Sequence, residues 1–476
     1  MKISLRSTRR GVAREGGPVY IEVRLDPGPR DAGPSTERKP VALCPVFDRS
    51  GSMGGPAGGW DRDMPPFGSN LPLTFGRTKM DGVKAAAHEL VDNIRDGDYV
   101  ALVSFSGTGR VEVPMTPVNV WSRELLHRAI SGFRPEDSTN LYEGMVLGEQ
   151  QFGPGLPATH NCKVVLLSDG LANVGITSPG GMADFALSAH RRGITVSTIG
   201  VGLDYGAEIM GTLAQCGGGR FYHIADTCRL TEIVLGELHS AASTMARRVT
   251  LEMSAGPLAA IGENLNLFRQ EAGPDGSVVY AGDLVGSRNI VFELAPTAGF
   301  TGESLPVRVV CRWDDENKKA RRATATLSLP VVNSGELETL PVDADLMAEV
   351  ARLLEAQATR LASGAYDAGD HARARASVSS GLTGLARMAA GIPGGEEVVW
   401  EAQERLENLA GRLDRHEVMV EEAKMMYCQA FDSTAGPQPS PGGLPAGDPA
   451  PGRRSPRGTK PGTPKRKRET SSGGAP

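Results

Sequence analysis

The hydrophobic pattern changes three times along the 476 residues of this chain. Between residues 41 and 245, short apolar runs alternate with segments in which apolar residues recur every three or four positions. The runs have the length of strands buried on both faces, and they lie at 41–47, 99–105, 162–167, 194–201 and 220–224. Strands that alternate with helices favour an α/β fold, a doubly wound and mostly parallel Rossmann-like sheet covered on both faces.

The segments between these runs have helical periodicity. Met80, Val83, Ala87, Leu90 and Ile94 would form one buried helix face. Similar segments lie at 121–131, 140–151, 180–192, 206–215 and 228–245. A short run at 110–115 follows the second strand closely enough to be its hairpin partner. We therefore expect one domain over residues 41–245.

From 247 to 333 the pattern becomes that of strands without intervening helices, at 248–253, 278–284, 289–294, 306–313 and 321–330. Consecutive strands of this kind predict an antiparallel β-sandwich. Residues 20–25 alternate in the same way. We expect the segment 1–40 to supply a strand to the sandwich, so that the α/β domain is an insertion in the β domain.

The helical period returns between 343 and 429. Leu346, Val350, Leu353 and Leu361 lie on one face of a first helix, and three more helices are expected at 366–389, 396–413 and 416–428. The stretch 365–376 faintly resembles tetratricopeptide-type helical hairpins. A small helical bundle that caps the sandwich is the favoured interpretation, with a peptide-binding array as the alternative.

The last segment, 433–476, consists of Pro, Gly, Ser and basic residues with almost no apolar content, which predicts a disordered tail. Two readings of its Lys465–Arg468 run remain open: a bipartite nuclear-import signal with Arg453 and Arg454, or a solubilising tail with weak anion binding. The whole chain has 51 Lys and Arg against 56 Asp and Glu, which gives no indication of specific nucleic-acid binding.

The chain also lacks the usual signals for export and membrane insertion. Its first residues hold no apolar run of a secretory signal, and no 18-residue apolar stretch suits a membrane span. The six cysteines are scattered without a Cys-x-x-Cys pair, which favours free thiols. We therefore expect a cytoplasmic protein.

Candidate chemistry lies where the first apolar run ends. Asp48, Ser50 and Ser52 occupy alternate positions there, so their oxygens would point at one spot. Thr139 and Asp169 follow at the spacing where further strand ends would deliver them. Hard oxygen ligands without sulfur or imidazole suit Mg²⁺, Ca²⁺ or Mn²⁺.

These stretches resemble the von Willebrand factor A (VWA) domain and its metal-ion-dependent adhesion site, in which Asp-x-Ser-x-Ser is followed by a Thr and by an Asp before Gly. All five positions match, as Asp48, Ser50, Ser52, Thr139 and Asp169. The resemblance implies a divalent cation, Mg²⁺ first and Mn²⁺ or Ca²⁺ otherwise. The three hydroxyls would hold it directly and the two carboxylates largely through water, and a partner's carboxylate would complete its shell.

Several catalytic motifs are missing. No two histidines lie within four residues of each other, and neither a P-loop nor a Gly-x-Ser-x-Gly elbow is present. Phosphotransfer sites generally hold their metals through carboxylates, whereas hydroxyls dominate here. We expect no enzyme activity.

The chain departs from the family in an insert at about 55–76, beside the expected metal. It carries Trp60, Phe67, Asp61 and Asp63. Three interpretations of the insert remain open: a plain surface loop, a lid that selects partners, or a loop whose Asp61 or Asp63 carboxylate caps the metal internally.

The leading hypothesis is a metal-dependent protein-interaction module that captures an acidic residue of a partner and scaffolds a cytosolic assembly. Similar intracellular bacterial proteins act with AAA+ ATPases or beside kinases and phosphatases. The alternative is a surface or exported adhesin with a cryptic export route.

Overall fold

The computed structural model describes residues 1–14, 16–28, 39–57, 78–136, 138–256, 259–274, 276–297, 302–390, 392 and 394–435. Most of the expected insert, including Trp60, Asp61, Asp63 and Phe67, lies outside the described residues, and so does the tail beyond Ala435.

The apolar runs of residues 41–245 form one six-stranded sheet with the order β6-β5-β4-β7-β8-β9. All neighbouring strands are parallel except β6, which pairs with β5 as an antiparallel hairpin. The strands are β4 (Val41–Asp48), β5 (Tyr99–Phe105), β6 (Gly109–Pro117), β7 (Asn161–Ser168), β8 (Ile194–Val201) and β9 (Gly218–Ile224). The expected doubly wound sheet is confirmed, including the hairpin.

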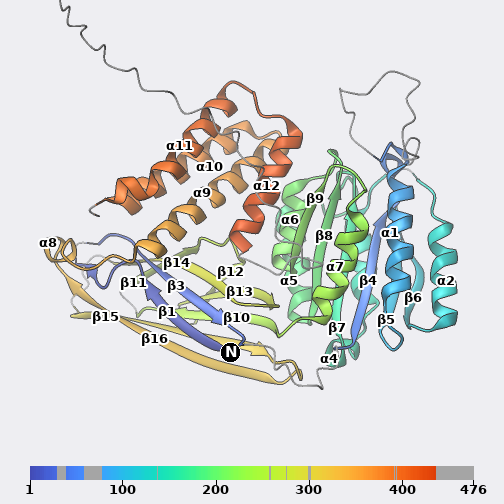
Figure 1. Ribbon diagram of the computed structural model, residues 1–476, viewed down its shortest axis with the longest axis horizontal. Coiled ribbons are helices and arrows are strands. Elements are labelled where there is room, and N and C mark those ends of the chain that lie inside the picture. Colours follow the sequence, from blue (N-terminus) through green and yellow to red (C-terminus); the bar gives the residue numbers. More distant parts are fainter. Residues whose placement is uncertain are drawn as a thin grey trace, which may run out of the picture.

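Helices cover both faces of this sheet (Figure 1). One face packs against α1, α2 and α7, and the other against α3, α5 and α6. Their bounds, with the short helices η1 and α4, are η1 (Gly51–Gly54), α1 (Lys79–Asn93), α2 (Val120–Ser131), α3 (Leu141–Gln150), α4 (Leu156–Thr159), α5 (Pro179–Arg191), α6 (Ala207–Cys216) and α7 (Leu230–Ala242). Helix α1 starts where Thr78 and Asp81 form a capping box, which satisfies free backbone N–H groups of the first turn.

The remaining strands form two sheets that share one hydrophobic core. The four-stranded sheet has the order β1-β3-β14-β11, and the six-stranded sheet has the order β12-β13-β10-β15-β16-β2. Their bounds are β1 (Lys2–Ser7), β2 (Val12–Ala13), β3 (Val19–Asp26), β10 (Ala246–Ser254), β11 (Ala259–Asn264), β12 (Gln270–Gly273), β13 (Gly276–Leu284), β14 (Arg288–Pro296), β15 (Ser304–Asp314) and β16 (Ala320–Val332). Every neighbouring pair is antiparallel except β2 with β16.

The N-terminal strand and the strands after the α/β domain belong to the same sheet. Ile21 of β3 lies opposite Phe292 of β14 in the antiparallel ladder. The chain therefore leaves the β structure after β3, forms the α/β domain, and then returns to the same β structure.

The C-terminal helices pack on the outer face of the four-stranded sheet, where Tyr20 and Val291 join their core (Figure 1). They are α9 (Ala344–Asp367), α10 (His371–Ala389), α11 (Gly395–Asp414) and α12 (Val420–Ala435). The short helix α8 (Ser334–Leu337) precedes them and contacts β2. Two expected boundaries need correction. Helix α9 continues to Asp367, because the chain turns only at Gly369, whose φ is +78°. Helix α12 continues to Ala435, past the expected limits at 429 and 433, because Tyr427, Phe431 and Ala435 pack into the core of the α/β domain.

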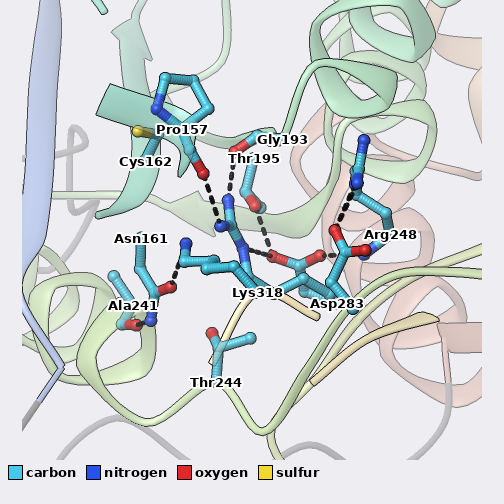
Figure 2. Close-up of polar contacts among 12 residues, drawn as sticks. Pro157, Asn161, Cys162, Gly193, Thr195, Ala241, Thr244, Arg248, Asp283 and Lys318 are labelled. Carbon is cyan, nitrogen blue, oxygen red and sulfur yellow. Dashed lines mark hydrogen bonds and ion pairs between the residues drawn. The ribbon is translucent and has the colours of Figure 1, made fainter. Parts of the chain in front are cut away.

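Polar contacts join the α/β domain to the β structure at the amino ends of β7 and β8 (Figure 2). Asp283 accepts hydrogen bonds from the Thr195 hydroxyl at 2.8 Å and from the backbone N–H of Arg248 at 3.0 Å. The ammonium group of Lys318 donates to Oδ1 of Asn161 at 3.0 Å. The β structure is therefore attached at the opposite end of the parallel sheet from Asp48.

All six cysteines are free in the described structure. Cys44, Cys162, Cys216 and Cys311 are buried, Cys428 is half-buried and Cys228 is exposed. No helix within the described ranges combines the length and the apolar character of a membrane span.

Candidate metal-binding site

Two neighbouring strands bring the candidate carboxylates together. Strand β4 ends at Asp48, and β7 ends at Ser168, directly before Asp169. Phe47 and Leu167 are register partners one residue earlier, so both strands end at the same level. The chain winds away from β4 and β7 in opposite directions, toward β5 and β8. This is the switch point at which α/β sheets bind ligands.

A third segment, which carries Thr139, is bound to the loops after both strands. The backbone N–H of Glu136 donates to the Arg49 carbonyl at 2.6 Å. The backbone N–H of Thr139 donates to Oδ1 of Asn173 at 3.0 Å, and the N–H of Asn173 returns a bond to the Thr139 carbonyl at 3.2 Å. Ser138 has a φ of +68°, a conformation that non-glycine residues adopt mainly where the surroundings enforce it. Thr139 is therefore held in place from both sides.

The three candidate hydroxyls converge on one point beside Gly170. A Cβ atom built on Gly170 would lie 3.2 Å from Thr139 Oγ1, 3.5 Å from Ser52 Oγ and 3.7 Å from Ser50 Oγ. The Ser50 and Ser52 hydroxyls are themselves 3.0 Å apart. Oxygens from two loops thus lie around the position that a side chain at residue 170 would occupy.

The two carboxylates are fully buried behind these hydroxyls. Asp48 accepts hydrogen bonds from the Ser50 backbone N–H at 2.7 Å and from the Ser168 hydroxyl at 2.5 Å. Burial raises the pKa of Asp48 to about 6, although these hydrogen bonds act in the opposite direction. Asp169 Oδ1 accepts from Ser52 Oγ at 2.7 Å and lies 3.5 Å from Ser50 Oγ. The carboxylates therefore orient the hydroxyls.

A lysine side chain that the sequence did not indicate completes the cluster. The ammonium group of Lys79 lies 2.8 Å from Asp169 Oδ2, and its side chain is only 13% exposed. Lys79 opens α1, which follows the insert, so no local pattern links it to Asp169. Ser168 and Asn173 were also missed. Ser168 adjoins Asp169 at the end of β7 and could have been found as a polar residue at a strand end, whereas Asn173 meets Thr139 only in the folded chain.

The structure brings all five predicted residues together, and their role as metal ligands stays a prediction. The donor set fits a hard divalent cation, because it offers hydroxyl and carboxylate oxygens and no sulfur or imidazole. Ser50, Ser52 and Thr139 would hold the ion, with Asp48 and Asp169 behind them. Within the described part of the chain, no three His, Cys, Asp or Glu side chains form a group that could hold a metal. The hydroxyls are thus the distinguishing feature of this cluster.

Gly170→Ala is expected to weaken divalent-cation binding by about tenfold or more while the protein stays folded. Its methyl group would fill the space between the three hydroxyls, and a lost ligand position is costly for a cation that demands six oxygens. Calorimetric titration with MgCl₂ would measure the effect. Gly180→Ala is the matched control, because no atom lies within 4 Å of the added methyl group. Equal affinities of both variants would show that the cation does not bind in this space.

Exposed apolar side chains lie on the loops that follow β7 and β8, the strands that end beside the cluster. Leu171 is 60% exposed and Leu203 is 40% exposed, and Val174 and Ile176 are also exposed. The Leu171 side chain lies 3.5 Å from the Cβ position of Gly206, so the two loops adjoin each other. We call Leu171, Val174, Ile176 and Leu203 the apolar collar. Exposed apolar residues that gather on adjoining loops are typical of interaction surfaces.

Comparisons with known proteins agree with this fold. The von Willebrand factor type A domain model matches residues 44–235. YfbK of Escherichia coli (strain K12) is 26% identical over 176 residues, which are 37% of this chain and 30% of YfbK. The chain thus spans less than a third of that relative.

Two solved structures are similar over almost the whole chain, each at 17% sequence identity. A von Willebrand factor type A protein from Catenulispora acidiphila has a TM-score of 0.64 and covers 90% of this chain and 96% of its own. The ArnB paralog VWA2 from Sulfolobus acidocaldarius has a TM-score of 0.55 and covers 91% and 97%. At 17% identity, the similarity of these two structures to the chain shows a shared fold and nothing beyond the fold.

The family match and the fold together identify residues 44–235 as a VWA domain. VWA domains are generally metal-dependent modules for protein–protein interaction, and they commonly bind a divalent metal.

Proposed function

We propose that this chain is a protein-interaction module in which a divalent cation, Mg²⁺ first, captures an acidic side chain of a partner protein. The observation that carries the proposal is the convergence of the Ser50, Ser52 and Thr139 hydroxyls on the space beside Gly170. Ligands that are mostly neutral leave the cation electrophilic, so a partner's carboxylate completes its shell favourably. Mn²⁺ and Ca²⁺ are the alternative ions.

We assign no catalytic step to this site. Asp48 accepts hydrogen bonds on both oxygens, and Asp169 is paired with Ser52 on one oxygen and with Lys79 on the other. A general base needs an oxygen within reach of the proton that it removes. Both carboxylates are therefore used for holding the site together.

The apolar collar adds a requirement on the partner. A segment that presents its carboxylate to the cation would lay the neighbouring residues on Leu171 and Leu203, both of which are exposed. Apolar residues beside the acidic one would bury this surface, and each Å² of buried apolar area would contribute about 25 cal/mol to the binding free energy. The preferred partner is therefore a protein segment in which an acidic residue lies between apolar residues.

The experiment that tests the proposal is capture of partners from a lysate with the immobilised protein in MgCl₂, in EDTA, and in EDTA followed by excess MgCl₂. We expect capture in the first and third conditions only, because the cation forms the contact with the partner's acid. Bound proteins that stay unchanged in EDTA would contradict metal-dependent capture.

Leu171→Ser together with Leu203→Ser is expected to lower affinity for a captured partner by about tenfold or more, since buried apolar side chains contribute about 1.5–3 kcal/mol each. Mg²⁺ affinity should stay unchanged. Leu361→Ser is the control, because Leu361 is 41% exposed but lies on α9, away from the site. Partner affinity that matches this control would remove the apolar collar from the interface.

We place the module in a cytosolic assembly, with an AAA+ ATPase or kinase and phosphatase partners as the candidates. The support is the attachment of the β structure and the helices as a scaffold behind the site. The alternative is a surface or exported adhesin. Fractionation of the native cells separates the two, because recovery only in the membrane or the medium would favour the adhesin.

A further inference from the structure

We propose that Lys79 tunes the candidate metal site: its ammonium group lowers the affinity for the divalent cation and strengthens capture of a carboxylate once the cation is bound. This inference rests on the proposed function of the same site. It adds a residue outside the family motif and assigns it a role that can be measured.

The pair between Lys79 and Asp169 is direct and buried. Lys79 Nζ lies 2.8 Å from Asp169 Oδ2, while the other oxygen, Oδ1, accepts from Ser52 at 2.7 Å. Asp169 is fully buried. Because water cannot screen the pair effectively, the positive charge acts strongly on everything bound nearby.

Three features of the chain hold Lys79 in this position. Its backbone N–H donates to the carbonyl of Gly55 at 2.9 Å, which ties the start of α1 to the turn that follows Ser52. Thr78, one residue before it, caps the helix. On the far side, a Cβ atom on Gly202 would lie 3.1 Å from Lys79 Nζ and 3.3 Å from its Cε. Gly202 therefore provides the space in which the ammonium group lies.

The charge balance gives the direction of the effect. Asp48 and Asp169 are the two acidic groups of the cluster, and Lys79 neutralises one charge when both are ionised. A divalent cation in the space between the hydroxyls meets less negative charge than the motif alone would offer. Once bound, the same cation is less neutralised, so it attracts a partner's carboxylate more strongly. Lys79 thus opposes binding of the divalent cation and favours the later binding of a carboxylate to that cation.

Lys79→Met tests this in the full-length protein. We expect Mn²⁺ to bind about tenfold more tightly, the order expected when a like charge is removed from a partly buried site. Electron paramagnetic resonance of free Mn²⁺ measures that affinity. Acetate binding to the Mn²⁺-loaded protein, followed by water-proton relaxation, should weaken about threefold or more. Opposite signs are the diagnostic result, since damage to the fold would weaken both.

Two further variants separate charge from structure. Lys79→Gln keeps a hydrogen-bond donor for Asp169 without the charge, and it should reproduce both changes. Lys84→Met removes a lysine from the same helix whose ammonium group donates to the Ser131 carbonyl at 3.3 Å, and it should change neither affinity. Thermal unfolding of each variant confirms that it is folded.

The outcomes also separate this inference from the proposed function. A parent protein that binds no Mn²⁺ would overturn both. A parent that binds Mn²⁺ with the same affinity as Lys79→Gln would overturn only the role of Lys79. Weaker Mn²⁺ binding in both Lys79 variants would assign the lysine a structural role instead.

Discussion

Replacing Asp48 and Ser50 together by alanine is expected to abolish divalent-cation binding, with an affinity loss of more than about a hundredfold. Ser50 supplies one of the three converging hydroxyls, and Asp48 accepts the backbone N–H that fixes Ser50. Metal-dependent capture of partners should disappear with it. Calorimetric titration with MgCl₂ measures the first effect, and capture from lysate in MgCl₂ measures the second.

The double variant should remain folded. Asp48 is fully buried and its pKa is raised to about 6 by burial, so its removal also removes an unfavourably desolvated charge. The Ser168 hydroxyl keeps a contact with the Gly170 carbonyl at 3.3 Å. Asp345→Ala with Ser380→Ala, both exposed on the C-terminal helices, is the matched control. Mg²⁺ affinity equal to that of this control would contradict the site assignment, and a collapse of the thermal transition would mark Asp48 as structural.

Lys424→Met is expected to destabilise the protein by about 3–5 kcal/mol, the cost of breaking a buried ion pair on one side. Lys424 is 1% exposed and lies 2.6 Å from Asp367 Oδ1. The second oxygen of Asp367 accepts the backbone N–H of Ala207 at 3.0 Å. Methionine keeps the volume of lysine but leaves the Asp367 carboxylate buried without its cation. Urea unfolding followed by circular dichroism would measure the change.

Two comparisons make this result interpretable. Adding Asp367→Asn to Lys424→Met should restore part of the stability, because the amide removes the uncompensated charge and keeps an acceptor for Ala207. Arg405→Met breaks an exposed pair with Glu355, which should cost no more than about 1 kcal/mol. A loss from Lys424→Met as small as that of Arg405→Met would show that α12 is not held by this pair.

The Lys424–Asp367 pair also connects the C-terminal helices to the VWA domain. Lys424 belongs to α12, whereas Ala207 opens α6 and follows the loop that carries Leu203. Tyr427 and Phe431 of α12 pack into the core beneath that loop. The helical region therefore buttresses one side of the candidate site in addition to covering the β structure.

The local sequence determined the elements that depend on short-range patterns. The parallel strands were predictable because a strand buried on both faces is a continuous apolar run, as in 41–47. Asp48, Ser50, Ser52, Thr139 and Asp169 were found because their residue types and spacing match a family motif. The hairpin of β5 and β6 followed from a short connection.

Several elements were missed because short-range patterns are weak there. Strand β12 has only four residues, too few for an alternation to stand out. The break between α9 and α10 was placed too early, although Gly369 and the helix-capping Asp370 mark the true position.

Only the tertiary structure decided what surrounds the motif. The sequence predicted that three hydroxyls could converge, but the space between them depends on Gly170, whose backbone passes beside all three. Lys79 reaches Asp169 across 90 positions of sequence, and Lys424 reaches Asp367 from another helix. Such pairs leave no periodicity in the chain, because they form only when packing brings distant segments together and excludes water from between them. The sequence by itself determined the strands and the motif of the VWA domain. Long-range packing decided which charged side chain lies beside the candidate site and which helix supports it.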